Sequence, residues 1–467
     1  MAARHAGVVA DPDLRCRAGP GAVVRGRRDP ADRAGGHRRP ADPSGPAGPD
    51  RGAGRPPARR RVLPAHRADR GRGGRDRSAG RPAQAAAHPL IRPPRRPAAR
   101  LADPDRGYRP SVTDAADPTA AHPATDRPVL PQRPFPRLLA RGADHAVASV
   151  VGLGCWQLGA DWGEVSEDDA LGVLRAALES GVTFFDTADV YGDGRSEQLI
   201  ARFVRDLPAA DRPMIATKVG RRADPFVAET YTDANLRAWV DRSRRNLDVE
   251  TLDLVQLHCP PPAVYSDDAV FDTMDSLQAE GALAGYGVSV ETCEEALTAI
   301  ARPGVVSVQI IVNAFRLKPL DEVLPAAAAA GIGVIARVPL ASGLLSGKYT
   351  ADTTFAADDH RSYNRNGEAF DVGETFSGVD FATGLAAVAD LQRALPDGVP
   401  LPQAALRWIV DQPGITTVIP GARNPRQAKS NAAAGRGWAT DGDSGRFDEA
   451  VHRVYDERLR AQIHPRW

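Results

Sequence analysis

The stretch Val182-Thr183-Phe184-Phe185-Asp186-Thr187-Ala188-Asp189-Val190-Tyr191-Gly192 is the most informative part of this sequence. Its first residues are mostly β-branched or aromatic, and polar residues and glycine follow them abruptly. This pattern predicts a buried strand that runs out into a loop at the rim of a sheet. The strand end would bring Asp186 to that rim, and the loop would bring Tyr191 to the same place.

Two later apolar stretches also end on a polar residue, one on Lys218 and the other on His258. Parallel strands that close into a barrel bring their carboxyl ends to one rim, where the active sites of such barrels lie. Four side chains are therefore expected to form one site: Asp186, Tyr191, Lys218 and His258.

Strand-like and helix-like stretches alternate eight times between residues 147 and 437. This repeat and this length favour a (β/α)8 TIM barrel, assigned to residues 147–460, over an open sheet. Several strands are apolar without alternation, as expected for parallel strands that are buried on both faces. A polar stretch at 346–380 interrupts the rhythm and is expected to be either a lid or locally disordered.

Residues 1–141 contain 30 arginines and 13 aspartates, a formal charge of +17, whereas the remaining 326 residues carry −16. Residues 1–140 are rich in Arg, Pro, Ala and Gly, with too few apolar side chains to offset the entropy cost of ordering. We therefore expect a disordered extension. It could be a mis-assigned start or shifted reading frame, a tail of unknown role, or a basic arm for nucleic acid. The lack of lysine and the scarcity of aromatic residues disfavour nucleic acid as a partner.

The four cysteines have no paired spacing, which disfavours a disulfide framework and indicates a reducing compartment. No apolar run reaches the length of about 18 residues that a membrane-spanning helix needs. The first residues lack the apolar centre of a secretory signal. Cys259 follows His258 without a second Cys/His cluster, so no metal site is expected. These features predict a cytoplasmic protein with no membrane association.

The four strand-end side chains suit proton transfer to a carbonyl oxygen. A phenol with a pKa near ~10 is a poor acid at neutral pH, and a nearby ammonium lowers that pKa. A buried ammonium needs a carboxylate partner, and an imidazole can orient a carbonyl and tune the same proton. Tyr191, Lys218, Asp186 and His258 supply this set. A hydride donor would then be required on the other face of the carbonyl.

The segments that carry these side chains resemble those of the aldo-keto reductase superfamily. They are Asp186-Thr187-Ala188-Asp189-Val190-Tyr191-Gly192, Ile215-Ala216-Thr217-Lys218 and Leu254-Val255-Gln256-Leu257-His258. Further stretches match the family in order: Gly152–Trp156, Tyr286–Ser289, Val308–Asn313, Pro339–Lys348 and Ile419–Gln427. The resemblance covers about residues 147–437, and the sequence Ala-Arg-Val-Pro-Leu at 336–340 places it near the bacterial NADP-dependent branch.

The resemblance implies NADP(H)-dependent reduction of an aldehyde or ketone, or the reverse oxidation, with use of NAD(H) left open. Tyr191 would donate the proton, and Lys218 paired with Asp186 would lower the pKa of the phenol. His258 would orient the substrate. The expected partner is a small-molecule carbonyl compound, whose identity the sequence does not reveal.

The resemblance also implies a cofactor site. Ser289 and Gln309 would hold the nicotinamide carboxamide, and Arg423 would meet the 2′-phosphate, since a planar guanidinium suits phosphate. The other cofactor positions carried over are Pro339, Leu340, Ser342, Gly343, Gly421, Gln427 and Asn431. Trp156 and Trp162 follow the first strand and are expected to line the substrate pocket.

Three features depart from the family pattern. Val290 stands where many members have an asparagine that binds the carboxamide, and Arg337 and Val338 stand where many have an aromatic residue. The N-terminal hairpin that usually closes the barrel floor is not recognisable between Phe135 and Ser149. We therefore expect an open floor, which would fit a disturbed reading frame upstream of Val150.

One alternative stays open beside the enzyme. A regulatory subunit could keep the same fold and bind the nicotinamide cofactor in order to report its redox state to a partner, with little turnover. The four strand-end residues do not distinguish this protein from a reductase, whereas turnover of an aldehyde would.

Overall fold

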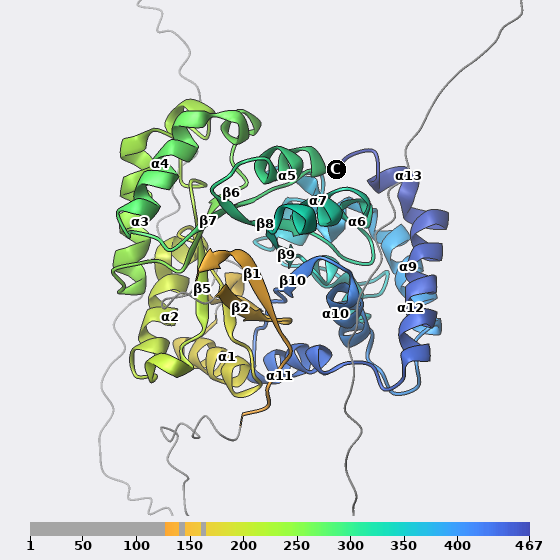
Figure 1. The fold of residues 1–467 in the computed structure, drawn as a ribbon. Helices are drawn as coiled ribbons and strands as arrows, with labels where there is room; N and C mark the ends of the chain where they lie inside the picture. Colours follow the sequence, from red (N-terminus) through yellow and green to blue (C-terminus); the bar gives the residue numbers. More distant parts are fainter. Residues whose placement is uncertain (1–126, 140–144, 160–164) are drawn as a thin grey trace, which may run out of the picture. The chain divides into compact units, whose positions relative to one another are not determined.

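A closed barrel of parallel strands forms the centre of the described part of the chain (Figure 1). The computed structural model describes residues 127–139, 145–159 and 165–467. Eight strands pair in chain order: β3 (Leu153–Gly154), β4 (Phe184–Asp186), β5 (Met214–Val219), β6 (Leu254–His258), β7 (Tyr286–Ser289), β8 (Val305–Ile311), β9 (Gly333–Arg337) and β10 (Ile415–Val418). Bridges from Val151 to Val418 and from Gly154 to Gly421 join the last strand to the first. The predicted (β/α)8 barrel is thus confirmed.

Helices surround the barrel. They are α1 (Glu167–Glu179), α2 (Arg195–Arg205), α3 (Asp233–Leu247), α4 (Asp268–Ala279), α5 (Cys293–Ile300), α6 (Lys318–Asp321), α7 (Val323–Ala330), α9 (Phe381–Arg393), α10 (Leu401–Asp411), α11 (Pro425–Ala433), α12 (Asp441–Val454) and α13 (Arg460–Ile463). Ser166 caps α1 as its sequence position predicts, because its side chain accepts a hydrogen bond from the Asp169 amide. Thr292 and Glu295 form a reciprocal capping box at the start of α5.

The strand β4 shows why an unbroken apolar run marks a buried parallel strand. Phe184 points into the barrel interior, where it belongs to a small core with Ala216 and Ile335. Phe185, the next residue, belongs to the larger core between the strands and the helices. Both rings are fully buried, so both faces of the strand exclude water.

The barrel floor is closed by an antiparallel hairpin of β1 (Gln132–Leu139) and β2 (His145–Ser149), which corrects the expected open floor. Phe135 is fully buried, and its ring stacks on Phe184 with the ring centroids 5.8 Å apart. At Gly333 an added Cβ would lie 2.2 Å from the Phe135 ring, so this strand position has no room for a side chain. The described fold therefore begins upstream of residue 147.

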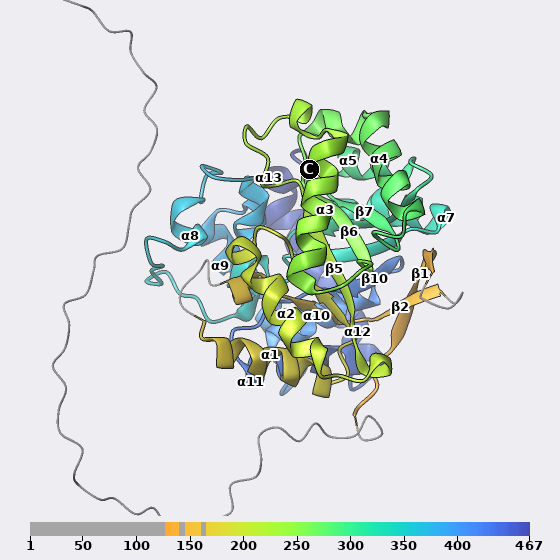
Figure 2. The same ribbon diagram turned by 90° about the vertical axis from the view of Figure 1, so that its left-hand side faces the viewer.

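The stretch at 346–380 is folded, and we call it the mouth segment. It contains the short helix α8 (His360–Tyr363) and two 3-10 turns, Val372–Glu374 and Phe376–Gly378. Its Asp371 accepts a hydrogen bond of 3.1 Å from the indole of Trp467, which ties the segment to the end of the chain. Figure 2 shows α8 on the side of the barrel opposite to the hairpin.

The predicted extension at residues 1–140 lies almost wholly outside the described residues, which begin at 127. Residues 132–139 of it form β1, so the predicted disorder is wrong for them, and it stays a prediction for residues 1–126. In the part of the chain that the structure describes, no helix is both long enough and apolar enough to cross a bilayer.

The hairpin can be tested through stability. Replacing Phe135 by alanine should lower the free energy of unfolding by about 3–5 kcal/mol, because it leaves a cavity at the barrel floor. Leu139→Ala is the matched control, since Leu139 lies in the same strand but is 56% exposed. It should change stability by less than about 0.5 kcal/mol. Urea denaturation of both variants measures the difference, and equal values would show that the hairpin does not fill the floor.

Candidate active site

The structure brings the four predicted strand-end side chains together at one mouth of the barrel. Asp186 and His258 are the last residues of β4 and β6, and Lys218 lies near the end of β5. Tyr191 begins the 3-10 turn that follows β4. The Lys218 ammonium forms an ion pair with Asp186 Oδ1 and lies 3.4 Å from the Tyr191 hydroxyl. It also donates to the carbonyl of Thr187 at 2.9 Å.

The ion pair between Lys218 and Asp186 is buried, and both partners are otherwise satisfied. The second carboxylate oxygen of Asp186 accepts hydrogen bonds from the amides of Gln309, at 2.8 Å, and Gln256, at 3.3 Å. A buried ion pair is stable only when such additional hydrogen bonds offset the loss of hydration. The orientation of the ammonium toward Tyr191 is therefore fixed by its surroundings.

Burial dominates the ionisation of the phenol. It raises the pKa of Tyr191 to about 12, although the neighbouring Lys218 acts in the opposite direction. The sequence led us to expect a lowered pKa, because the ammonium was considered without the loss of water around the hydroxyl. In this state of the protein the phenol carries its proton at neutral pH.

His258 is neutral in this environment. Burial, and then the charges of Arg221 and Lys218, lower its pKa well below the ordinary value. Its ring stands edge-on to the Tyr191 ring, with the centroids 5.9 Å apart. The buried Nδ1 atom has no hydrogen-bond partner among the described residues. A neutral imidazole can donate one hydrogen bond at this position without adding charge.

Aromatic rings form a wall beside the phenol. Trp156 stacks near Tyr191, with the centroids 6.0 Å apart, and its other neighbours are His360 and Phe370 of the mouth segment. Trp156, which the sequence predicts to be a substrate-pocket residue, lines the cavity. Trp162, the other predicted pocket residue, lies outside the described residues. His360 and Phe370 had no sequence signal, since nothing local places a long loop over a distant strand end.

A cavity of about 400 Å³ runs from this wall to the start of α11. It is lined by Asp186, Tyr191 and His258, whereas Lys218 does not line it. All of the predicted cofactor positions line it as well: Ser289, Gln309, Pro339, Leu340, Ser342, Gly343, Gly421, Arg423, Gln427 and Asn431.

The far end of the cavity is held by hydrogen bonds within the loop between β10 and α11. The side chain of Gln427 accepts from the Arg423 amide at 2.7 Å, and that of Asn431 donates to the Gly421 carbonyl at 3.1 Å. Asn424 caps α11 through the Gln427 amide. The exposed Arg423 therefore stands just before a helix N-terminus, where anions bind favourably.

Sequence reasoning missed an arginine–glutamate network at the barrel mouth, in which Arg337 and Glu374 are buried and Arg221 and Glu291 are half-buried. Arg337 lies 2.7 Å from Glu291 and 3.5 Å from Glu374, and Arg221 lies 3.3 Å from Glu374. The one signal in the sequence was Arg337, an arginine at the end of an apolar strand. Its partner Glu374 comes from the mouth segment, whose path the sequence did not reveal.

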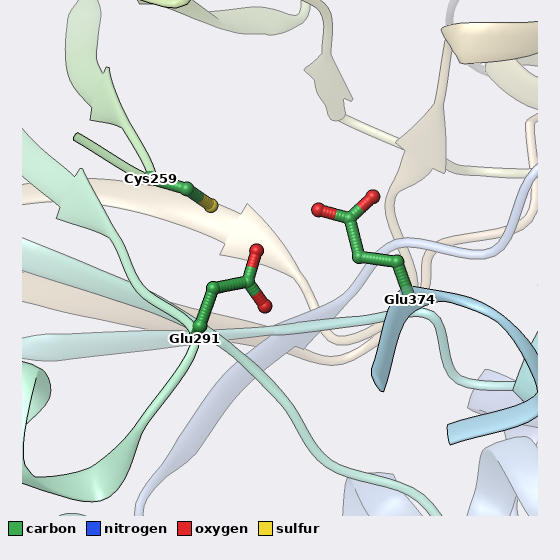
Figure 3. Close-up of side chains that lie close together, drawn as sticks. All are labelled: Cys259, Glu291 and Glu374. Carbon is green, nitrogen blue, oxygen red and sulfur yellow. The ribbon is translucent and has the colours of Figure 1, made fainter. Parts of the chain in front are cut away.

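Cys259 and both glutamates of this network point toward one another (Figure 3). One ligand atom from each of the three side chains lies within 4.8 Å of the others, a spacing that a metal ion could use. The guanidinium of Arg337 already contacts all three, including the Cys259 sulfur at 3.7 Å. The carboxylates therefore have cationic partners within the protein.

The fold and the site together define the class of protein. It is a closed (β/α)8 barrel in which a phenol, a lysine–carboxylate pair and an imidazole lie at the mouth beside a long cavity. Residues 150–451 match the model of the Aldo/keto reductase family. The chain therefore belongs to this family.

The matches to known relatives span the barrel of this chain and most of the length of each relative. The chain is 30% identical over 302 residues to aldo-keto reductase YhdN of Bacillus subtilis, covering 63% of this chain and 87% of that protein. It is 32% identical over 296 residues to the uncharacterized oxidoreductase Rv2298 of Mycobacterium tuberculosis, covering 61% and 84%. The solved glycerol dehydrogenase AKR11B4 of Gluconobacter oxydans superposes with a TM-score of 0.56 at 29% identity, covering 68% and 95%.

Proposed function

We propose that this protein is an NADP(H)-dependent oxidoreductase that reduces an aldehyde or ketone to an alcohol. The observation that carries the proposal is the Lys218 ammonium, which contacts both Asp186 and the Tyr191 hydroxyl behind a cavity that the phenol lines. Membership of the Aldo/keto reductase family supports oxidoreductase activity.

The donor groups along the cavity fit a nicotinamide dinucleotide. At one end the ends of β7 and β8 supply the side chains of Ser289 and Gln309, which suit an amide. At the other end Arg423 and the N-terminus of α11 suit phosphate. Between them the loop after β9 turns sharply at Ser342 and Gly343, where φ is 52° and 92°. Both residues of this turn line the cavity.

Bound NADPH would supply the hydride to the carbonyl carbon. Tyr191 would transfer its proton to the carbonyl oxygen, so that the hydride and the proton together convert the carbonyl into an alcohol. Lys218 would stabilise the phenolate that remains, because an ammonium favours the charged form of a neighbouring phenol. Asp186 holds that ammonium in place, and His258 would orient the carbonyl oxygen through a hydrogen bond.

The role of the phenol is tested by Tyr191→Phe. The variant should lower kcat for reduction of a generic aldehyde by about 10²–10⁴-fold, because the proton donor is lost while the ring remains. NADPH binding should change little. Tyr455→Phe is the control, since this tyrosine contacts His464 in the C-terminal helices. A wild-type chain that binds NADPH but turns over no aldehyde would favour the regulatory-subunit alternative.

The ionisation of the phenol predicts how the rates depend on pH. With a pKa of about 12, Tyr191 keeps its proton between pH 6 and 9, so kcat/KM for reduction should be flat across that range. Alcohol oxidation requires the phenolate, whose fraction rises roughly tenfold per pH unit below the pKa. The oxidation rate should therefore climb with pH. A reduction profile that falls near neutral pH would contradict the raised pKa.

Arg423→Ala tests the choice of cofactor. The variant should weaken NADPH binding by roughly ten- to a hundredfold, the range expected for hydrogen bonds to a charged group, and leave NADH binding nearly unchanged. Arg426→Ala is the matched control, because Arg426 is exposed near the start of the same helix and does not line the cavity. Titration calorimetry with each cofactor measures the effect. Equal losses for NADPH and NADH would show that Arg423 does not read the 2′-phosphate.

A further inference from the structure

Three neighbouring strands present polar side chains to one part of the cavity. Ser289 of β7 pairs in register with Gln309 of β8, and Ile311 of β8 pairs with Arg337 of β9. Ser289, Gln309 and Arg337 all line the cavity. Cys259 links two of them, because its sulfur lies 3.7 Å from an Arg337 nitrogen and 3.4 Å from the Ser289 hydroxyl. If Ser289 and Gln309 hold the nicotinamide amide, as the proposed function requires, the guanidinium of Arg337 would lie near that amide.

The guanidinium of Arg337 is fixed on one side and has a donor left over. Its terminal nitrogens contact the Val290 carbonyl at 2.9 Å, Glu291 at 2.7 Å and Glu374 at 3.5 Å. Its Nε atom is buried and has no partner in the described part of the chain. The side chain is only 9% exposed, so little water screens its charge.

Two guanidinium groups of this network, those of Arg221 and Arg337, contact the same carboxylate of Glu374. Burial would raise the pKa of Glu374, but Arg221 and Arg337 outweigh burial and lower it to about 2. Burial raises the pKa of Glu291 to about 8 in spite of the neighbouring Arg337. One carboxylate therefore faces two guanidinium groups. The ion pair of Lys218 and Asp186 is neutral as a unit.

The two redox forms of a nicotinamide differ in charge. The oxidised ring is a pyridinium cation, and the reduced dihydropyridine ring is neutral. A buried cation beside the ring therefore destabilises only the oxidised form. We propose that Arg337 is a specificity-determining residue that makes the cavity bind NADPH more tightly than NADP⁺. This inference rests on the proposed function and concerns the same site.

The test measures the dissociation constants of NADPH and NADP⁺ separately, by titration calorimetry on the full chain, and uses their ratio. In the wild type NADP⁺ should bind more weakly than NADPH. Arg337→Met should reduce the ratio of the NADP⁺ constant to the NADPH constant by roughly tenfold, as expected for loss of a nearby unit charge. Arg337→Lys keeps the charge and should keep most of the ratio. Glu374→Gln removes a negative charge and should raise the ratio.

These outcomes separate the electrostatic role from a structural one. A merely structural Arg337 would weaken both cofactors equally, and an unchanged ratio in Arg337→Met would overturn the inference. If Arg337→Met fails to fold, Glu374→Gln provides the test. A ratio of dissociation constants in Glu374→Gln that is no higher than in the wild type would also overturn the inference. If the wild type binds both cofactors but none of these substitutions changes the ratio of the two dissociation constants, the inference is overturned and the proposed function stands. A wild type that binds neither overturns both.

Discussion

The buried ion pair between Lys218 and Asp186 is the interaction on which the site depends. Moving an ammonium and a carboxylate out of water costs several kcal/mol for each ion, so a buried pair survives only with good geometry and further hydrogen bonds. Here the carboxylate receives the amides of Gln256 and Gln309, and the ammonium donates to the Thr187 carbonyl. Every one of these partners comes from a strand of the barrel or from the residue directly after one. The closed sheet is therefore what holds the charges at the bottom of the cavity.

The two ends of the barrel have separate tasks. The hairpin of β1 and β2 fills the floor with Phe135 and Leu138, which are buried in the core of the barrel interior. The opposite end carries the loops that shape the cavity, as is usual for such barrels. The aromatic wall and the arginine–glutamate network both belong to that end. Packing at the floor thus supports the strand ends without taking part in the chemistry.

The structural features that could be predicted from the sequence alone are those that depend on a local pattern of residues. The strand ends at Asp186, Lys218 and His258 were identifiable because an apolar run that stops on a polar residue is a local signal. The lowering effect of Lys218 on the pKa of Tyr191 was predicted, but the larger rise caused by burial was not, because burial is a property of the whole fold. The floor hairpin was missed because Pro134 and Pro136 lie within β1, where proline argues against a strand, and few of its side chains are buried.

The mouth segment shows which features no local pattern could place. It was expected to be either a lid or locally disordered; it is folded, packs around Phe376, and lines the cavity with residues that include His360 and Glu374. His360 joins the aromatic wall, and Glu374, fourteen positions later, joins the buried charges. One loop thus supplies both the surface that would face a substrate and an acid that contacts two arginines. Recombination or loop grafting that altered the shape of the pocket would therefore alter its internal charge as well, so the two properties would evolve together.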